Sequence, residues 1–229
     1  MSAIGAVPRR GFIAGSLATT GLLLLPACQS TGQISFTEAI RRLLLISSQR
    51  AFARMTAPGG YWDEQVARIG LNGFLGSRGG AVASILTSPL FKGRLESAFA
   101  DIAEEGSYRA APLVADAVRT IGIANAVALV RGGPTAATAF LRGEMGVTLI
   151  EAMVPQVGDA LRVAQDPVVG QLLSALTGVD VSTVSRDFSR RVDDAIWNEI
   201  GVEEAAIRAD PRSANDPLIT AALGAAQAF

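Results

Sequence analysis

The sequence contains no histidine, and this absence removes much of the chemistry that enzymes perform near neutral pH. Imidazole is the usual general acid or base, so Ser–His–Asp and Cys–His arrangements are excluded, and so is zinc bound by histidine. A mechanism that uses carboxylate, lysine or serine groups stays open. The absence favours a protein that is not an enzyme, and we expect neither a metal site nor a cofactor.

Cysteine and excess charge are also scarce. Cys28 is the single cysteine, so no disulfide forms within the chain. The 20 Lys and Arg residues nearly balance the 21 Asp and Glu residues, which gives no sign of the basic surface that binds nucleic acid. Hydrophobic residues make up 49% of the 229 positions, which is typical of a globular protein with a substantial core.

The first 27 residues have the features of a cleaved export signal. Arg9 and Arg10 precede an apolar run from Phe12 to Leu25, which is too short for a comfortable membrane span. The arginine pair resembles the twin-arginine export motif, and the general export route stays open as an alternative.

The apolar run ends in Leu25-Pro26-Ala27-Cys28, which resembles a bacterial lipobox, where the cysteine is acylated and becomes the new N-terminus. Each buried CH₂ of an acyl chain contributes roughly 0.8 kcal/mol, so a multiply acylated Cys28 would hold a domain on a membrane. The alternative is that Cys28 is a small buried hydrophobe. Gln29, in place of Asp, favours the outer over the inner membrane, with residues 28–35 as a tether and the domain in the periplasm.

The remaining chain, residues 36–229, shows the periodicity of helices and almost none of strands. We therefore expect one all-α domain, a compact multi-helix bundle of short helices. Four residues stand before a proline where a helix is expected to begin: Ser88, Gly133, Asp166 and Asp216. Pro155 predicts a kink or a break.

Two stretches of the first half allow alternative interpretations. Phe36 to Met55 has apolar residues at helical spacing, and arginines stand between them at positions 41, 42, 50 and 54. These arginines either contact anionic lipid headgroups beside the anchor or belong to an ordinary first helix of the domain. The glycine-rich stretch from Ala57 to Ala83 predicts a flexible loop or close helix packing, pinned to the core by Tyr61 and Trp62.

The stretch from Ala128 to Arg142 predicts a tight corner between two helices. Gly132 and Gly133 can take the left-handed conformation that closes a helix, and Pro134 fits the first position of the next one. A long amphipathic helix is expected from Val181 to Pro211. Its polar face carries three opposite-charge pairs at i,i+4 spacing, namely Asp187/Arg191, Arg190/Asp194 and Glu204/Arg208.

These two regions together resemble the bacterial domain-of-unknown-function family 4197, over roughly residues 36–229. The corner carries Leu129–Gly133, Ala136–Thr138 and Phe140–Arg142, and its family-like residues are Gly132, Gly133, Thr138 and Phe140. The long helix carries Asp194–Trp197, Ile200, Glu203, Glu204, Ile207, Arg208, Asp210 and Pro211, and a weaker match is Asn72–Leu75. Ala195 and Leu141 depart from the family's Gly and Phe. The resemblance implies a helical, exported protein, often a lipoprotein, with no assigned activity and no catalytic residues.

The polar residues inside these motifs form the candidate site: Arg142, Asp194, Glu203, Glu204 and Arg208. They either bind a ligand or partner as a cluster or serve as ion pairs and caps on helix surfaces. Adjacent Glu203 and Glu204 point to different sides of a helix, which disfavours a paired-carboxylate site. Trp197 is expected at the edge of the core.

Two functions follow as expectations. The first is a lipid-anchored envelope protein whose helical domain binds a protein partner or an apolar ligand. The alternative is an envelope hydrolase that uses carboxylates or serine, which predicts a concave pocket where acidic side chains converge with raised pKa values.

Overall fold

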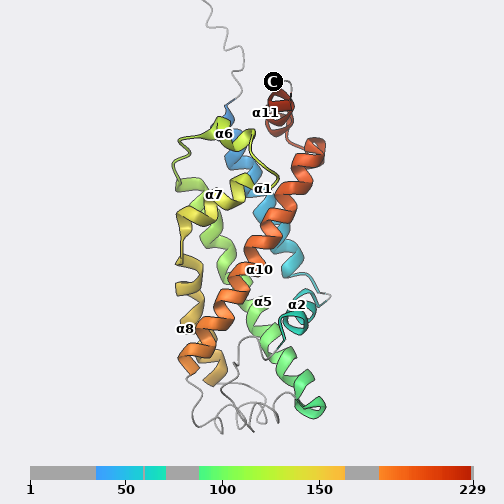
Figure 1. Ribbon diagram of the computed structural model, residues 1–229, viewed down its shortest axis with the longest axis vertical. Helices are drawn as coiled ribbons and strands as arrows, with labels where there is room; N and C mark the ends of the chain where they lie inside the picture. Colours follow the sequence, from blue (N-terminus) through green and yellow to red (C-terminus); the bar gives the residue numbers. More distant parts are fainter. Residues whose placement is uncertain (1–34, 59, 71–87, 163–180, 228–229) are drawn as a thin grey trace, which may run out of the picture. The chain divides into compact units, whose positions relative to one another are not determined.

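The computed structural model describes residues 35–58, 60–70, 88–162 and 181–227, and every regular element in them is helical (Figure 1). The all-α prediction is thus confirmed for this part of the chain. All of it belongs to one compact unit that starts at Ile34. The export signal, Cys28, the Asn72–Leu75 match and the predicted cap Asp166 lie outside the described residues.

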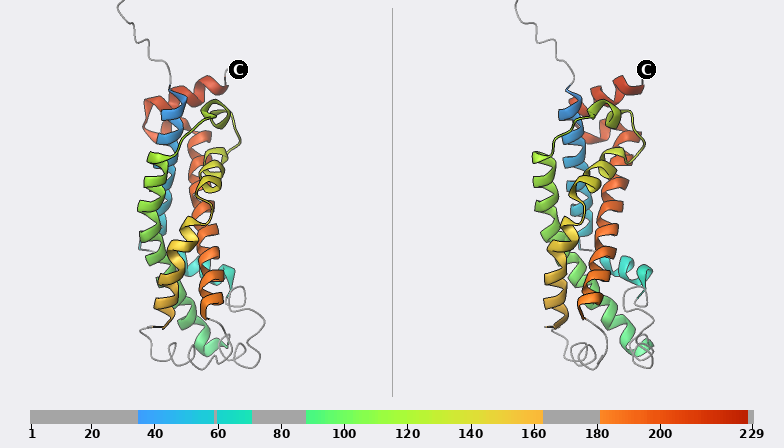
Figure 2. Two further views of the ribbon diagram at one scale, coloured as in Figure 1. Left: turned by 90° about the vertical axis from the view of Figure 1, so that its left-hand side faces the viewer. Right: turned by 60° about the vertical axis from the view of Figure 1, so that its left-hand side comes forward.

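The first helix, α1, has the predicted bounds Phe36–Met55 and packs against both α5 (Pro89–Thr120) and α10 (Val181–Ala209) (Figures 1 and 2). Its arginines contact these and other helices of the same domain. Arg41 donates to the carbonyls of Val118 and Ile121 at the end of α5, at 3.3 and 3.5 Å. The arrangement is that of an ordinary first helix, in which the arginines connect neighbouring segments.

The long helices differ from the prediction of short ones. α5 has 32 residues and continues through Pro112. Pro112 and Tyr108 are both exposed, so the Tyr108 carbonyl that loses its N–H partner can bind water. α8 (Thr148–Arg162) likewise continues through Pro155 and does not end there.

Part of the stretch predicted as a flexible loop or as close helix packing is helical. α2 (Tyr61–Ile69) begins after Gly60, which has a positive φ of 78°, and it packs mainly against α5. Trp62 is buried and forms an edge-on contact with Tyr61, with ring centroids 5.2 Å apart. The predicted anchoring of this segment by its two aromatic residues is therefore confirmed.

The core lies around α10, which packs against α1 and α8 and, through fewer contacts, against α7 (Ala136–Met145) (Figure 2). Val192, Ile196 and Ile200 are buried, which confirms the predicted apolar stripe. The rings of Phe99 on α5 and Phe188 on α10 meet with centroids 4.7 Å apart. Among the described residues, no helix is long and apolar enough to span a bilayer.

Short elements complete the domain: α6 (Ala126–Val130), the 3₁₀ helix η2 (Pro211–Ala214) and α11 (Pro217–Gln227), which contacts α1 and α6. Asp216 caps α11 as predicted, since its Oδ1 accepts the N–H groups of Leu218 and Ile219 at 2.8 and 3.1 Å. Arg42 of α1 donates to Oδ2 at 3.1 Å. This carboxylate thus both starts α11 and connects it to α1.

Replacing Asp216 with Ala should destabilise the domain by about 1 kcal/mol, measured by urea unfolding at neutral pH, because the cap is lost. Burial raises the pKa of Asp216, but the N–H of Ile219 and the guanidinium of Arg42 outweigh it and leave the pKa below its usual value. The contribution should therefore be full above pH ~4 and disappear as the pH falls through the lowered pKa. Asp216→Asn, which keeps the capping oxygen, should cost less than Asp216→Ala; an equal cost would contradict the capping role.

Candidate functional site

Helix α10 carries four buried carboxylates: Asp193, Glu199, Glu203 and Glu204. Their exposed fractions are 2, 6, 6 and 0%. Acidic side chains are almost never buried to this degree unless they are paired. The partners of these four residues therefore decide whether the helix carries a reactive site or a set of structural contacts.

Glu204 binds the start of a different helix. Its Oε1 accepts the N–H of Ala137 at 3.0 Å, and its Oε2 accepts the N–H of Thr138 at 2.6 Å. The first N–H groups of a helix have no partner within that helix, and the N-terminus carries a partial positive charge. Glu204 is thus the cap of α7, supplied from about 66 residues further along the chain.

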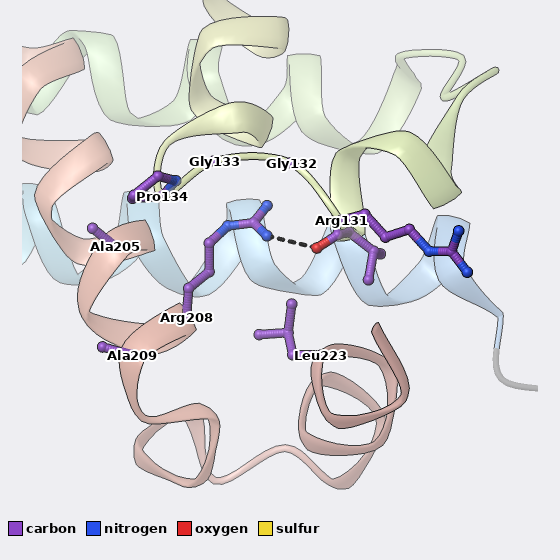
Figure 3. Close-up of a pocket in the computed structure, with 9 residues that line it drawn as sticks. Arg131, Gly132, Gly133, Pro134, Ala205, Arg208, Ala209 and Leu223 are labelled. Atoms are coloured by element: carbon purple, nitrogen blue, oxygen red, sulfur yellow. Dashed lines mark hydrogen bonds between the residues drawn. The ribbon is translucent and has the colours of Figure 1, made fainter. Parts of the chain in front are cut away.

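Arg208 lies one turn after Glu204 and binds the end of α6. Its Nη1 and Nη2 donate to the carbonyls of Val130 and Leu129 at 3.0 and 2.9 Å, and its Nε donates to Glu204 Oε1 at 2.7 Å. Figure 3 shows Arg208 extending from α10 toward the corner formed by Gly132, Gly133 and Pro134. The Glu204–Arg208 pair on α10 therefore holds the end of α6 and the start of α7.

The two glycines of the corner act differently from the prediction. Neither Gly132 nor Gly133 has a positive φ, so the predicted left-handed closure is wrong. A Cβ on Gly132 would lie 2.5 Å from the Cβ of Ala136 and 3.2 Å from the Ala128 carbonyl oxygen. Glycine is needed there for close approach. α7 begins at Ala136 with Thr135 as its N-cap residue, so the prediction that Pro134 is its first residue is also wrong.

A second contact joins α7 to α10. Arg142 donates to Asp193 Oδ2 at 3.1 Å and also to Asp194, while Trp197 Nε1 donates to Asp193 Oδ1 at 2.9 Å. Burial raises the pKa of Asp193, against the opposing effects of Arg142 and the Trp197 hydrogen bond. Trp197 is 3% exposed, so it lies in the core and not at its edge.

A third contact joins α1 and α2 to α10. Arg54 donates to Glu199 Oε1 at 2.5 Å and to Glu203, and the hydroxyl of Tyr61 donates to Glu199 Oε2 at 3.3 Å. Burial, followed by the negative charge of Glu199, raises the pKa of Tyr61. The phenol therefore stays protonated at neutral pH and remains a donor.

The structure places the five candidate residues in three separate contacts. Arg142 lies with Asp194, Glu204 lies with Arg208, and Glu203 binds Arg54, an arginine of α1 that was not among the candidate site residues. Glu203 and Glu204 face different partners, as their adjacency predicted. The other two predicted pairs have different partners in the structure. Asp187 contacts Arg190 at 3.6 Å instead of Arg191, and Asp194 contacts Arg142 instead of Arg190.

Asp193 and Glu199 were missed, although a signal for them was present. Asp193 follows Val192 directly, and Glu199 precedes Ile200, so each stands next to the buried apolar stripe of α10. An acid beside such a stripe is a candidate for a buried, paired carboxylate. The partner could not be identified in this way, because Arg54 lies 145 residues from Glu199.

A groove of about 370 Å³ lies beside the corner. Its walls come from the corner itself, the end of α10 and α11: Val130, Arg131, Gly132, Gly133, Pro134, Ala205, Arg208, Ala209 and Leu223 (Figure 3). Over the described part of the chain, no group of three or more Cys, His, Asp or Glu residues is arranged to hold a metal ion.

Comparison with known proteins gives one family. A family model described as "Protein of unknown function (DUF4197)" matches residues 30–224. No curated protein and no solved structure matches the chain.

Replacing Glu204 with Gln should destabilise the domain by about 3–5 kcal/mol, because it leaves Arg208 buried without its counter-ion and places an NH₂ group against a backbone N–H. Urea unfolding measures the effect. The control is Glu105→Gln, which removes another i,i+4 pair, Glu105–Arg109, with the same 2.7 Å distance but more than half-exposed side chains. It should cost less than about 1 kcal/mol. Similar costs for the two variants would contradict the buried role of Glu204.

The adjacent glycines provide a second matched test. Gly132→Ala should cost about 1–3 kcal/mol, because the new methyl collides with Ala136 and the α6 carbonyls. Gly133→Ala meets nothing within 4 Å and should change the free energy of unfolding by no more than about 1 kcal/mol, with stabilisation allowed. Equal destabilisation by both substitutions would show that backbone conformation, and not close approach, selects glycine here.

Proposed function

The chain belongs to the DUF4197 family of proteins of unknown function, and from that premise we propose that it is a lipid-anchored bacterial envelope protein whose helical domain is a non-catalytic binding module. The observation that carries the non-catalytic role is that every buried carboxylate of α10 is engaged by an arginine. The anchor is proposed from Cys28 and the signal-like segment before it.

The engaged carboxylates support a binding role over catalysis. A general acid or base must reach the proton it transfers in a bound substrate. Both oxygens of Glu204 accept backbone N–H groups, and both oxygens of Asp193 accept side-chain donors. Both oxygens of Glu199 are likewise occupied, by Arg54 and Tyr61. These three acids join helices, and both oxygens of each accept hydrogen bonds. Glu203 is held by Arg54 through its Oε1.

The groove beside the corner also supports a binding role over catalysis. The hydrolase alternative requires a concave site where acidic side chains converge. The nine residues that line this groove include two arginines and no acid. Its size lies within the range of small-molecule sites, and its mixture of apolar walls and a few polar groups is typical of binding pockets.

The anchor would place the domain close to a membrane. Helix α1 begins at Phe36, so residues 28–35 separate the proposed anchor from the first helix. Eight residues span at most about 27 Å when fully extended. A domain on such a tether would meet ligands or partners at the membrane surface, with the outer membrane favoured by Gln29.

Replacing Cys28 with Ala tests the anchor. The variant should lose incorporation of labelled palmitate and should move from the detergent phase to the aqueous phase in Triton X-114 partitioning, because no sulfur remains to carry the acyl chains. Ser30→Ala, two residues away, is the control and should stay labelled. Gln29→Asp should keep its label and shift from outer- to inner-membrane fractions. Persistent labelling of Cys28→Ala would refute the proposed anchor.

A further inference from the structure

The first turns of α1 lie beside the end of α5, α6 and α11. Arg41 donates to the carbonyls of Val118 and Ile121 at the end of α5, and Arg42 contacts Asp216, the cap of α11, at 3.1 Å. α11 also contacts α6, and α6 contacts α1. The start of α1, α6 and α11 therefore lie together at one end of the helical domain (Figures 1 and 2).

The surface that α6 and α11 present at this end is apolar. Residues 217–229 contain no charged residue, and no acidic residue stands between Asp116 and Glu144. We call the exposed residues of these two helices, as far as the structure describes them, the anchor-side face: Val127 and Ala128 on α6, and Pro217, Ala221 and Gly224 on α11.

The charges next to the anchor-side face are compensated within the domain. Each acidic residue on the neighbouring turns of α1, α5, η2 and α11 either pairs with an arginine or caps a helix: Glu38, Asp116, Asp210 and Asp216. An uncompensated charge would be costly on a surface that loses contact with water. This end can therefore meet an apolar or interfacial environment without leaving a carboxylate unpaired.

The proposed anchor also reaches the domain at this end. Residues 28–35, which carry no charge, lead from Cys28 into α1 and span at most about 27 Å. α5 has 32 residues and is about 48 Å long, and α1 contacts it through Arg41 at its last turn. The other end of α5 is thus farther from the start of α1 than the tether can span, and the anchor-side face is close to it.

We infer that the anchor-side face docks on the phospholipid surface that holds Cys28. α11, with 11 residues, is too short to cross a bilayer and lies on its surface, next to α6. The exposed apolar side chains are few and small, so the acyl chains of Cys28 supply the affinity and the face determines the orientation of the domain. This inference rests on the proposed anchor and names the partner of the domain as the bilayer itself.

A single-thiol label tests the contact. Cys28 is the only cysteine of the chain, and the anchor occupies its sulfur, so Val127→Cys or Ala221→Cys supplies the one reactive thiol of the lipidated protein. Val147→Cys is the control, since Val127 and Val147 are 47 and 57% exposed and Val147 precedes α8, which packs mainly against α10 and α5. Each variant carries the fluorophore NBD and is reconstituted in phosphatidylcholine vesicles that contain a doxyl-lipid quencher.

The labels on the anchor-side face should lose at least about half of their fluorescence to the doxyl lipid, because docked side chains reach the boundary between headgroups and acyl chains. The label at Val147 should lose less than about a tenth, because it stays in water. Equal quenching at Val127 and Val147 would overturn the inference. So would a Val127 label that is shielded from water in native envelopes but not in protein-free vesicles, since a protein would then cover this end.

A charge on the face provides a second test. Ala221→Glu, added to the Val127→Cys variant, should reduce the quenching at Val127 at least about twofold, because a carboxylate resists transfer from water into the interface. Ala53→Glu is the matched control, since Ala53 is also exposed but lies near the other end of α1, and it should leave the quenching unchanged. Equal effects of the two glutamate substitutions would contradict docking through this face.

The outcome is separable from that of the proposed function. If Cys28 carries palmitate and the Val127 label stays unquenched on the vesicles, the orientation is wrong and the anchored module stands. A chain that carries no palmitate and does not bind the vesicles overturns both.

Discussion

The Glu204–Arg208 pair is the interaction on which the corner of this domain depends. At the corner, the carbonyl end of α6 and the N–H end of α7 lie close together, and neither has partners within its own helix. A carboxylate and a guanidinium one turn apart on α10 satisfy both ends at once. A buried ion pair recovers the cost of desolvation only when its remaining polar atoms are also bonded. Here both carboxylate oxygens accept backbone N–H groups, so the pair stabilises the corner and fixes α6 and α7 to α10.

The same principle recurs through the bundle. Arg41 binds the carbonyl end of α5, Asp216 binds the N–H end of α11, and Arg54 holds two carboxylates of α10 from α1. These three charged side chains therefore connect helices to one another, since each compensates either a helix end or an opposite charge. Carboxylates that hold helices together in this way are poorly suited to proton transfer, because protonation would remove the contact that holds the helices.

The sequence predicts the elements better than their connections. Helix α1 has the predicted bounds, Asp216 caps α11 as expected, and the stripe on α10 is buried, because each depends on residues within a few positions of one another. The Glu204–Arg208 pair was also visible from its spacing. Its burial and its partners in α6 and α7 were not, since these lie 66 to 79 residues away and helical periodicity carries no information on such distances. The role of Gly132 was missed for a related reason: the collision that excludes a side chain arises only once Ala136 and the α6 carbonyls are in place.

Two ion pairs with the same spacing show that the environment of a pair, and not its sequence motif, determines its structural role. Glu105–Arg109 and Glu204–Arg208 are both i,i+4 pairs with 2.7 Å contacts, yet the first is half exposed and the second buried. The residues through which the chain resembles its family include Gly132, Glu204 and Arg208, which together build the corner. Ala205, Ala209 and Leu223 line the groove and take no part in the bonds that hold the corner. Leu223 also belongs to the hydrophobic core, so a chain with this architecture can change the size of its groove at Ala205 and Ala209 while the buried pair keeps the fold in place.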